Sequence, residues 1–435
     1  MVQAACPSIE PSKSARKKLL KAKLKAQPAP GTRCAFRQVE KDYLTRNPPP
    51  DYSHVIDFSH EKLPDGVVAS QANGLTYSTH CDDGRHNSQL NVGLFVYTID
   101  AHPGLFIIPD ALSSNSQRDF IKSCMRDMTL KPNLNNLDTH YDLPNEGLWY
   151  HYESHFRDPA TRPDTVVKPL CLAAQVDAAV DKQPTSRKLV NDPPITSGTP
   201  VEVLRSKKDP AQASTSLKPL PVSELLYKLR WTNLGLLYHW GTKSYHYEDI
   251  FQNGAESMIK VPTYLAALSK NILDIVPREL IPPMETWSDF QPESGIINFY
   301  QLKDTLMGHI DQSELVEDKP LVSLSFGHTT VFLIGHKTRD VAPTAIYLRS
   351  GDALIMSGAC RRAYHGVPRI VEGSLPKHLQ HSTDWDNSDR ETTTQEQRDD
   401  WDVFAKYMST TRINVNIRQV FPRDYLSSIS KLSIV

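Results

Sequence analysis

The amino-acid sequence predicts an α+β protein whose core is a closed or sandwiched antiparallel β-sheet, with helices beside it. Three observations predict this class. Short runs of β-forming residues, separated by turn residues, recur between positions 295 and 356. Polar and apolar residues alternate strictly from Arg412 to Arg418, as on a strand with one buried face. Two segments, residues 117–125 and 395–408, have the character of helices.

Length and composition bound the organisation of the chain. Its 435 residues suffice for one large domain with extensions. Hydrophobic residues make up 39% and prolines number 32, so we expect loop-rich or disordered portions beside the core. The net charge of −1 excludes a protein-wide basic field, and any nucleic-acid binding must come from local patches.

The 6 cysteines are scattered and form no Cys-x-x-Cys pair, which excludes the common zinc spacings. We interpret them as reduced thiols of an intracellular protein. No apolar run reaches transmembrane length and no secretory signal opens the chain, so we expect no membrane association.

The first residues of the chain contain a strongly basic, helix-prone run at positions 12–26. Three interpretations stay open: a nuclear-import or nucleic-acid-binding patch, a mitochondrial presequence, and a solvated tail. A presequence is normally richer in Arg and Ser than this run is. We expect residues 1–50 to form a basic, disordered tail.

Residues 51–158 have a mixed character. A strand-like run lies at positions 105–109, and Ser113 is a candidate N-terminal cap for the helix over residues 117–125. No chemistry is assigned to this region.

Two later segments are polar. Residues 159–217 are rich in Pro, Ser, Thr and Asp and lack periodicity, so we expect a disordered insertion there. Residues 373–400 contain an acidic run that we expect to face solvent. Between the two, residues 223–229 predict a short helix.

His309 and Asp311 are candidate metal ligands because they lie two residues apart. On a strand, this spacing directs both side chains to one face. A second imidazole from a neighbouring strand, such as His365, would complete a set of two histidines and one carboxylate. Such a set, with open positions opposite it, is typical of non-haem Fe(II) sites.

A single His-x-Asp pair is weak support, and context decides its meaning. Two other pairs have the same spacing but polar surroundings and no matching downstream set, and we interpret them as solvated loops: His80 and Asp82, His140 and Asp142. The pair at His309 instead follows a strand-like run and precedes four more runs that lead to His365: residues 295–300, then 321–326, 330–334, 345–348 and 353–356.

The alternation near the C-terminus places two guanidinium groups and two amides on one strand face. Arg412, Asn414, Asn416 and Arg418 share this face, and Ile, Val and Ile occupy the other. One interpretation is an edge strand with its polar face in water. Beside a metal triad, the alternative is favoured: a guanidinium binds a carboxylate of a dicarboxylate co-substrate through two parallel hydrogen bonds.

The motifs, taken in order, resemble the AlkB family of 2-oxoglutarate-dependent dioxygenases. Residues 216–421 are most similar to its eukaryotic AlkB-homologue-one branch, and residues 53–158 are more weakly similar. The resemblance implies a double-stranded β-helix, or jelly roll, with flanking helices. It places the dioxygenase core at residues 218–424 and the N-terminal part of the same domain at 51–158. The motifs are Asn298-x-Tyr300, His309-x-Asp311, Tyr364-His365-Gly-Val-Pro and Arg412-x-Asn414-x-x-x-Arg418.

The resemblance also implies the cofactors and their ligands. His309, Asp311 and His365 would be the catalytic residues and would hold Fe(II), with 2-oxoglutarate and O2 as co-substrates. Arg412 would bind the distal carboxylate of 2-oxoglutarate with help from three residues, and Arg418 would orient Asp311 or the C1 carboxylate. The three helpers would be Asn298, Tyr300 and Asn414.

Trp231 and Tyr238 match the segment of the family that recognises the nucleotide, and the alternative is that both rings are ordinary core residues. The bacterial repair enzymes carry an acidic residue two positions after the metal-binding Asp, and this chain has Ser313 there, followed by Glu314. That difference argues against efficient repair of cationic methylated bases in DNA.

The expected activity is oxidative demethylation of N-methylated nucleic-acid bases. The expected substrate is 1-methyladenosine in transfer RNA or other RNA, with single-stranded DNA as a further candidate. Two alternatives remain: a protein or histone demethylase or hydroxylase with the same cofactors, and a non-catalytic jelly-roll binding protein. We expect a monomer in the nucleus and cytoplasm, with the mitochondrion as an open alternative.

Overall fold

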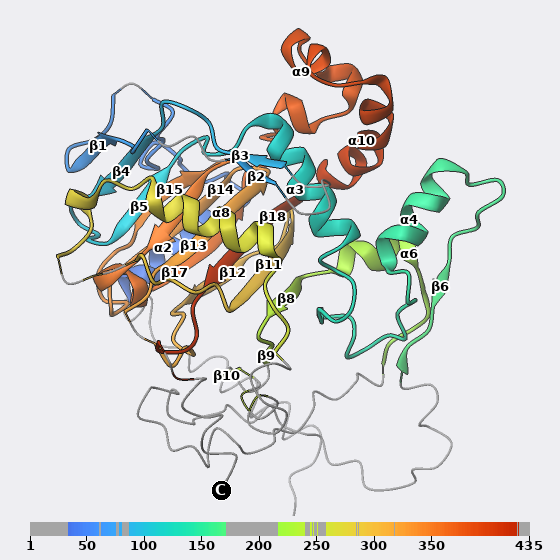
Figure 1. The fold of residues 1–435 in the computed structure, drawn as a ribbon, viewed down its shortest axis with the longest axis horizontal. Coiled ribbons are helices and arrows are strands. Elements are labelled where there is room, and N and C mark those ends of the chain that lie inside the picture. Colours follow the sequence, from blue (N-terminus) through green and yellow to red (C-terminus); the bar gives the residue numbers. More distant parts are fainter. Residues whose placement is uncertain are drawn as a thin grey trace, which may run out of the picture.

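The computed structural model describes residues 34–170 and 216–425, apart from positions 61, 75–77, 81–86, 240–243, 246, 248–249, 251–257, 284, 286, 317 and 424. The basic run at 12–26, most of the predicted insertion at 159–217, and Asp82 therefore lie outside the described residues. Two antiparallel sheets form the body of the molecule (Figure 1).

The larger sheet has eight strands. All of its paired neighbours run antiparallel. In spatial order the strands are β1 (Val67–Gln71), β4 (Phe95–Ile99), β5 (Leu105–Ile108), β16 (Ala353–Met356), β13 (Leu321–Gly327), β18 (Thr411–Arg418), β11 (Ser294–Gln301) and β8 (Trp231–Gly235).

The smaller sheet has four strands and faces the larger one. Its order is β12 (Leu306–His309), β17 (His365–Ile370), β14 (Thr330–Ile334) and β15 (Thr344–Leu348). Three two-stranded ribbons complete the strands of the described residues: β2 (Ser78–His80) with β3 (Asn87–Gln89), β6 (Val166–Val167) with β7 (Leu220–Pro221), and β9 (Tyr238–His239) with β10 (Ser244–Tyr245).

Alternation along the strands builds the layers. On β18, Ile413, Val415 and Ile417 join the apolar layer between the larger sheet and its helices. The opposite face of the larger sheet packs against the smaller sheet through a second layer that includes Ile107, Leu354 and Phe332. The polar residues of β18 point into this space between the sheets, where a site can form.

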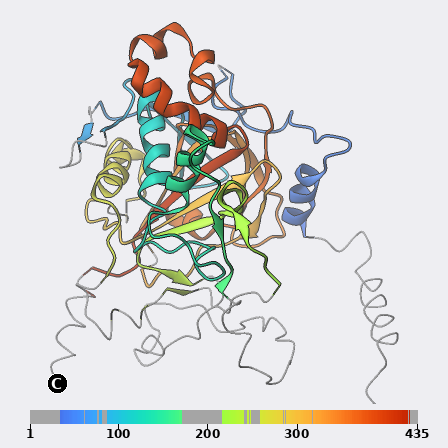
Figure 2. The same cartoon turned by 90° about the vertical axis from the view of Figure 1, so that its right-hand side faces the viewer.

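Helices cover both outer faces. Figure 2 shows α8 (Thr263–Asp274) and α2 (Ala35–Leu44) on opposite sides of the sheets. On the larger sheet lie α3 (Ser114–Arg126), α4 (Leu148–Arg157), α6 (Val222–Leu225), α8 (Thr263–Asp274) and α10 (Gln395–Met408). Among the described residues, the other helical elements are α2, α9 (Asn387–Glu391) and five 3-10 turns, Leu226–Lys228, Arg278–Leu280, Gly358–Arg362, Lys377–Leu379 and Ser382–Asp384.

The predicted α+β jelly-roll fold with flanking helices is thus confirmed. The Ser113 side chain caps α3 by accepting from the Ser116 amide at 3.2 Å. The helix predicted over residues 395–408 is α10, which begins with a capping box at Thr394. None of the described helices is both long and apolar enough to cross a membrane.

The predicted tail boundary at residue 50 is wrong. Residues 35–44 form helix α2 (Ala35–Leu44), which packs on the outer face of the smaller sheet (Figure 2). Phe36 and Tyr43 are buried there, among Val331 and Leu333 of β14. These two aromatics lie seven residues apart, on one helix face, so their burial holds the helix on the sheet.

The predicted insertion at 159–217 also begins too early. Residues 166–167 form β6, which pairs with β7 at residues 220–221. The Val167 side chain is 3% exposed and belongs to the main core, whereas Val166 is 59% exposed.

A matched pair of substitutions tests this boundary. Val167→Asp is expected to lower the free energy of unfolding by about 3–5 kcal/mol, because it buries an unpaired carboxylate. Val166→Asp should change it by less than about 0.5 kcal/mol, since the side chain stays in water. Thermal unfolding of both variants measures the difference, and equal melting temperatures would contradict the packing of β6.

The polar segment at 373–400 is more structured than its composition predicts. Trp385 is buried under the Arg118 guanidinium, whose carbon lies 4.1 Å from the ring centroid. The same guanidinium pairs with Asp389 at 3.1 Å. Asp384 and Asp386 are exposed, as the sequence suggested for the acidic run.

Candidate metal centre and co-substrate site

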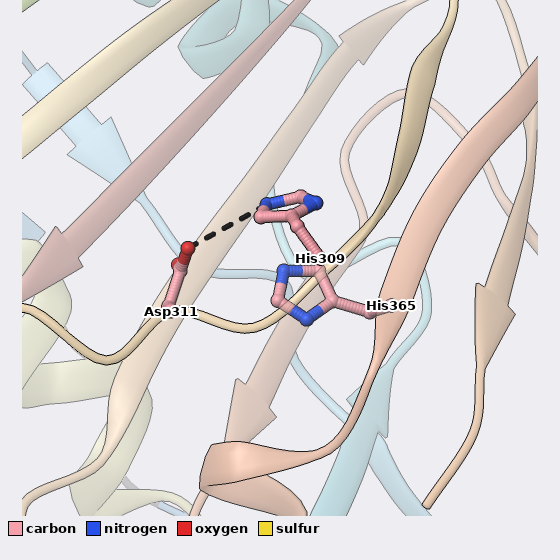
Figure 3. Close-up of side chains that lie close together, drawn as sticks. All are labelled: His309, Asp311 and His365. Atoms are coloured by element: carbon pink, nitrogen blue, oxygen red, sulfur yellow. Dashed lines mark ion pairs between the residues drawn. The ribbon is translucent and has the colours of Figure 1, made fainter. Parts of the chain in front are cut away.

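The three predicted metal ligands converge at one end of the space between the sheets. One ligand atom from each of His309, Asp311 and His365 lies within 4.8 Å of the other two (Figure 3). They form the one such group found in the described part of the chain. His309 and His365 are direct cross-strand partners on β12 and β17, and their ring centroids are 4.4 Å apart.

Asp311 reaches the site by a different route from the predicted one. Strand β12 ends at His309, so the shared-face spacing of a strand does not place the carboxylate. Two arginines hold it instead. Arg361 Nη1 donates to the Asp311 backbone carbonyl at 3.1 Å, and Arg418 Nη2 pairs with the carboxylate at 3.2 Å.

Backbone carbonyls orient both imidazoles. His309 Nδ1 lies 2.9 Å from the Met307 carbonyl oxygen, and His365 Nδ1 lies 3.1 Å from that of Ala363. A carbonyl can only accept, so each Nδ1 carries the proton and each Nε2 keeps its lone pair. In both rings Nε2 is therefore the atom able to bind a metal.

The charges of the site also fit a cation. Burial, helped by the His309 charge, lowers the pKa of His365 to about 4, which keeps this imidazole neutral at physiological pH. Burial by itself would raise the pKa of Asp311, but Arg418 and the two histidines outweigh it and hold that pKa well below its usual range. The centre thus combines a neutral His365 imidazole with an ionised Asp311 carboxylate.

Glu314 lies in a buried ion network beside the triad. Its carboxylate is 1% exposed and pairs with Arg418 at 3.2 Å and Arg361 at 3.1 Å. The Tyr245 hydroxyl donates to it at 2.9 Å. Burial acts to raise the pKa of Glu314, but the two arginines lower it overall. This acid, which directly follows Ser313, is therefore bound by two arginines and a tyrosine.

Arg412 is a buried guanidinium of a different kind. It is 1% exposed, and its Nη atoms donate to the His328 carbonyl at 2.9 Å, the Leu348 carbonyl at 3.3 Å and Ser325 Oγ at 2.8 Å. Within the described residues no carboxylate lies in ion-pair contact with it, and its buried Nε has no partner. Burial lowers the pKa of Arg412 to about 10, which still leaves it charged at neutral pH.

The other predicted co-substrate residues lie on the same sheet face as Arg412. The β11–β18 register pairs Tyr300 with Arg412 and Asn298 with Asn414. Tyr300 is buried between the sheets, and Asn414 Nδ2 donates to Ser323 Oγ at 2.8 Å. Cross-strand pairing thus gathers the Asn-x-Tyr and Arg-x-Asn motifs side by side.

The two predicted base-stacking aromatics lie at the edge of this face. Trp231 begins β8, opposite Asn298, and is half-buried. Tyr238 is also half-buried and forms a hydrogen bond with Ser313, while burial raises its pKa to about 12. Its ring packs edge-on against Tyr245 at 5.3 Å. Neither ring lies in the fully buried core.

Several residues of the site carry no motif that predicts them. Arg361 and Ser325 contact the triad and Arg412, respectively, yet no motif marked them. Ser323 and Ser325 alternate with apolar residues along β13, and this alternation was the available signal. Asn233 shares the face of Trp231 on β8, is 2% exposed, and has a carboxamide oxygen without a partner.

Comparison with known proteins agrees with this geometry. Residues 201–418 match the 2OG-Fe(II) oxygenase superfamily. The DNA N(6)-methyladenine demethylase ALKBH1A of Arabidopsis thaliana is 30% identical over 403 residues, which cover 89% of this chain and 96% of that protein. The nucleic acid dioxygenase ALKBH1 of Homo sapiens is 29% identical, over 90% of this chain and 85% of that protein.

A fungal relative extends the comparison. The tRNA demethylase abh1 of Schizosaccharomyces pombe is 28% identical, over 75% of this chain and 82% of that protein. These relatives match most of the chain, including the part that carries the metal triad. The chain therefore belongs to the 2OG-Fe(II) oxygenase superfamily, in the AlkB-homologue-one branch of the AlkB family.

Proposed function

We propose that this protein is an Fe(II)- and 2-oxoglutarate-dependent demethylase of N-methylated nucleic-acid bases, with methylated RNA as the preferred substrate. One observation carries the proposal: a His-Asp-His triad shares the space between the sheets with a buried arginine that has no carboxylate partner among the described residues. The relatives named as a nucleic acid dioxygenase and a tRNA demethylase support this class of substrate.

The donor set fits Fe(II). His309 Nε2, His365 Nε2 and an Asp311 oxygen are the residues that would hold the ion, and together they are the set of two histidines and one carboxylate that non-haem iron enzymes use. When bound, iron with 2-oxoglutarate and O2 supplies the oxidation of an N-methyl carbon, which then leaves the base as formaldehyde.

The surroundings of Arg412 fit 2-oxoglutarate. Arg412 forms no direct ion pair among the described residues, and the Asp352 carboxyl acts on it only through space. A buried guanidinium without a paired carboxylate is costly, and the distal carboxylate of a dicarboxylate would neutralise it. The Nε without a partner, together with an Nη, can donate to that carboxylate in parallel. Tyr300, the direct cross-strand neighbour of Arg412, places a hydroxyl on the same face as a further donor.

Other residues of the chain position the reacting groups. Arg418 and Arg361 hold Asp311 in place and keep its carboxylate ionised. The apolar layer between the sheets, including Phe332 and Tyr300, keeps water from the region of Arg412. Fixed groups of this kind hold the reacting atoms in the correct orientation. Binding and orientation are the main contributions of a protein to the chemistry of a cofactor.

1-methyladenosine in RNA, itself a cation at neutral pH, is proposed from the relative named as a tRNA demethylase, since the residues next to the triad do not select it by charge. Ser313 offers no charge, and its neighbour Glu314 is committed to Arg361 and Arg418. A carboxylate facing a cationic methylated base is therefore not supplied at this position. The partnerless oxygen of Asn233 is instead an acceptor suited to an amino group of a base.

An unpaired base in an RNA loop is the expected form of the substrate. A base within a duplex cannot bring its methyl group to the metal, and unstacking costs a few kcal/mol that a loop nucleotide avoids. Trp231 and Tyr238 are half-buried aromatic residues at the edge of the site. Stacking on such rings contributes about 1–3 kcal/mol per base, and nearby cations such as Arg230 add a salt-dependent share.

The Trp231→Ala variant tests this substrate pocket. It should lower kcat/KM on methylated transfer RNA by about 5- to 150-fold, which corresponds to about 1–3 kcal/mol of stacking. Trp231→Phe should retain most of the activity, and Tyr150→Ala, which removes an exposed ring on α4, should have no effect. The readout is demethylated nucleoside from the transfer RNA and from the same base in a duplex. A preference for the duplex, or full activity in Trp231→Ala, would contradict the pocket.

A further inference from the structure

Strand β12, which carries His309, is an edge strand of the smaller sheet. Its pairing with β17 is irregular between Leu306 and His309, and its far side has no strand neighbour in the described sheet. An edge strand of four residues is a weak support for a metal ligand, since one row of its backbone groups lacks a ladder partner.

Side chains take the place of the missing strand at Gly308, the residue before His309. Glu40 Oε1, on helix α2, accepts from the Gly308 amide at 2.8 Å. Arg339 Nη2 donates to the Gly308 carbonyl at 2.7 Å. Both backbone groups of this residue are therefore fixed by side chains.

Phe36 fills the space beside the same glycine. A Cβ added at Gly308 would overlap the Phe36 ring, and one added at Gly335 would lie 2.8 Å from it. The ring centroid of Phe36 is 6.2 Å from that of Tyr364, the residue before His365. One aromatic of α2 therefore packs against the neighbours of both histidine ligands.

The helix is in turn tied to the loop that supplies Arg339. The Phe36 amide donates to the Arg339 carbonyl at 3.0 Å, and the Arg339 guanidinium lies 4.5 Å from the Tyr364 ring centroid. Glu40 is buried, and Arg37 on the same helix balances its charge. Helix α2, Arg339, Gly308 of β12 and Tyr364, which precedes β17, are therefore connected by direct contacts.

We propose that α2 is a positioning element of the metal centre, in which Glu40 and Phe36 fix the backbone of Gly308 and thereby the His309 imidazole. The inference rests on the proposed role of His309 as a metal ligand. Partners outside the ligand set change metal affinity about 10- to 100-fold in other metalloproteins, because they set the orientation of the ligand. Helix α2 belongs to residues 1–50, the segment predicted from the sequence to be a disordered tail.

The test is Co(II) affinity of the full-length protein, followed under argon by the visible spectrum of bound Co(II). Glu40→Ala removes the acceptor of the Gly308 amide and should weaken Co(II) binding at least about tenfold. Glu40→Gln keeps an oxygen acceptor and should restore affinity to within about threefold of wild type. Gln38→Ala, on the exposed face of α2, should bind as wild type does.

Tyr43→Leu separates positioning from simple docking of the helix. Tyr43 is buried at the other end of α2, against Tyr52, and does not contact Gly308. Its replacement should lower the melting temperature without changing Co(II) affinity. If Tyr43→Leu weakens Co(II) binding as much as Glu40→Ala does, α2 has only a structural role and the inference is overturned.

A double-mutant cycle provides an independent check. Gly308→Ala should weaken Co(II) binding because its Cβ meets the Phe36 ring, and Phe36→Leu in the same chain should restore part of the affinity. If the effects of Gly308→Ala and Phe36→Leu on Co(II) affinity are additive, the two residues are not coupled and the inference is overturned. Wild-type protein that fails to bind Co(II) would instead refute the proposed metal site, so the two failures are distinguishable.

Discussion

Alanine at His309, Asp311 or His365 is expected to abolish Fe(II)- and 2-oxoglutarate-dependent turnover and to leave the folded state intact. Each change removes one of only three ligand atoms, so the loss should exceed the about 10- to 100-fold typical of an outer partner. The fold should survive because the triad lies at one end of the intersheet space. In Asp311→Ala, Arg418 keeps its ion pair with Glu314. Formaldehyde release and circular dichroism of each variant are the measurements.

Asp142→Ala is the matched control for this prediction. It removes the carboxylate of a second His-x-Asp pair, which has the same spacing but an exposed Asp. Its activity should equal that of wild type. Retained turnover in His309→Ala, or lost turnover in Asp142→Ala, would show that the metal ligands are assigned wrongly.

Arg412→Ala should raise the apparent KM for 2-oxoglutarate by about two to four powers of ten. The guanidinium is buried, so the co-substrate carboxylate would lose its partner in a dry environment, a change that costs about 3–5 kcal/mol. The KM for the nucleic acid should change much less, because Arg412 lies between the sheets and not at the edge that carries Trp231. Initial rates at varied 2-oxoglutarate concentrations, and separately at varied nucleic-acid concentrations, measure the two KM values.

Arg412→Lys should restore only part of the 2-oxoglutarate affinity, because an ammonium cannot donate two parallel hydrogen bonds. Arg162→Ala, which removes an exposed guanidinium, is the control and should behave as wild type. An unchanged 2-oxoglutarate dependence in Arg412→Ala would contradict the assignment of the co-substrate site.

Local pattern was enough to predict some elements closely. Residues 395–408 form α10 as predicted, and Ser113 caps α3, because helix signals are local in sequence. The alternation from Arg412 to Arg418 predicted the two faces of β18, since the period of a strand depends on nothing outside it.

Contacts between distant segments could not be predicted in this way. Glu314 pairs with Arg361 and Arg418, and only the fold brings these residues together. Helix α2 was not predicted because it was grouped with the basic run at residues 12–26 as one disordered tail. Phe36 and Tyr43 nevertheless have helical spacing. The position of Asp311 likewise depends on two arginines from other elements, not on the strand that the spacing suggested.

The most direct test of the proposed function is a substrate panel for the purified, iron-loaded protein. Methylated transfer RNA, methylated single-stranded DNA and methylated peptide are each incubated with and without 2-oxoglutarate, and formaldehyde and demethylated product are quantified. We expect 2-oxoglutarate-dependent demethylation of 1-methyladenosine in the transfer RNA, and we expect it to be lost in His309→Ala. Demethylation of the peptide but of neither nucleic acid, or product formation without 2-oxoglutarate, would contradict it.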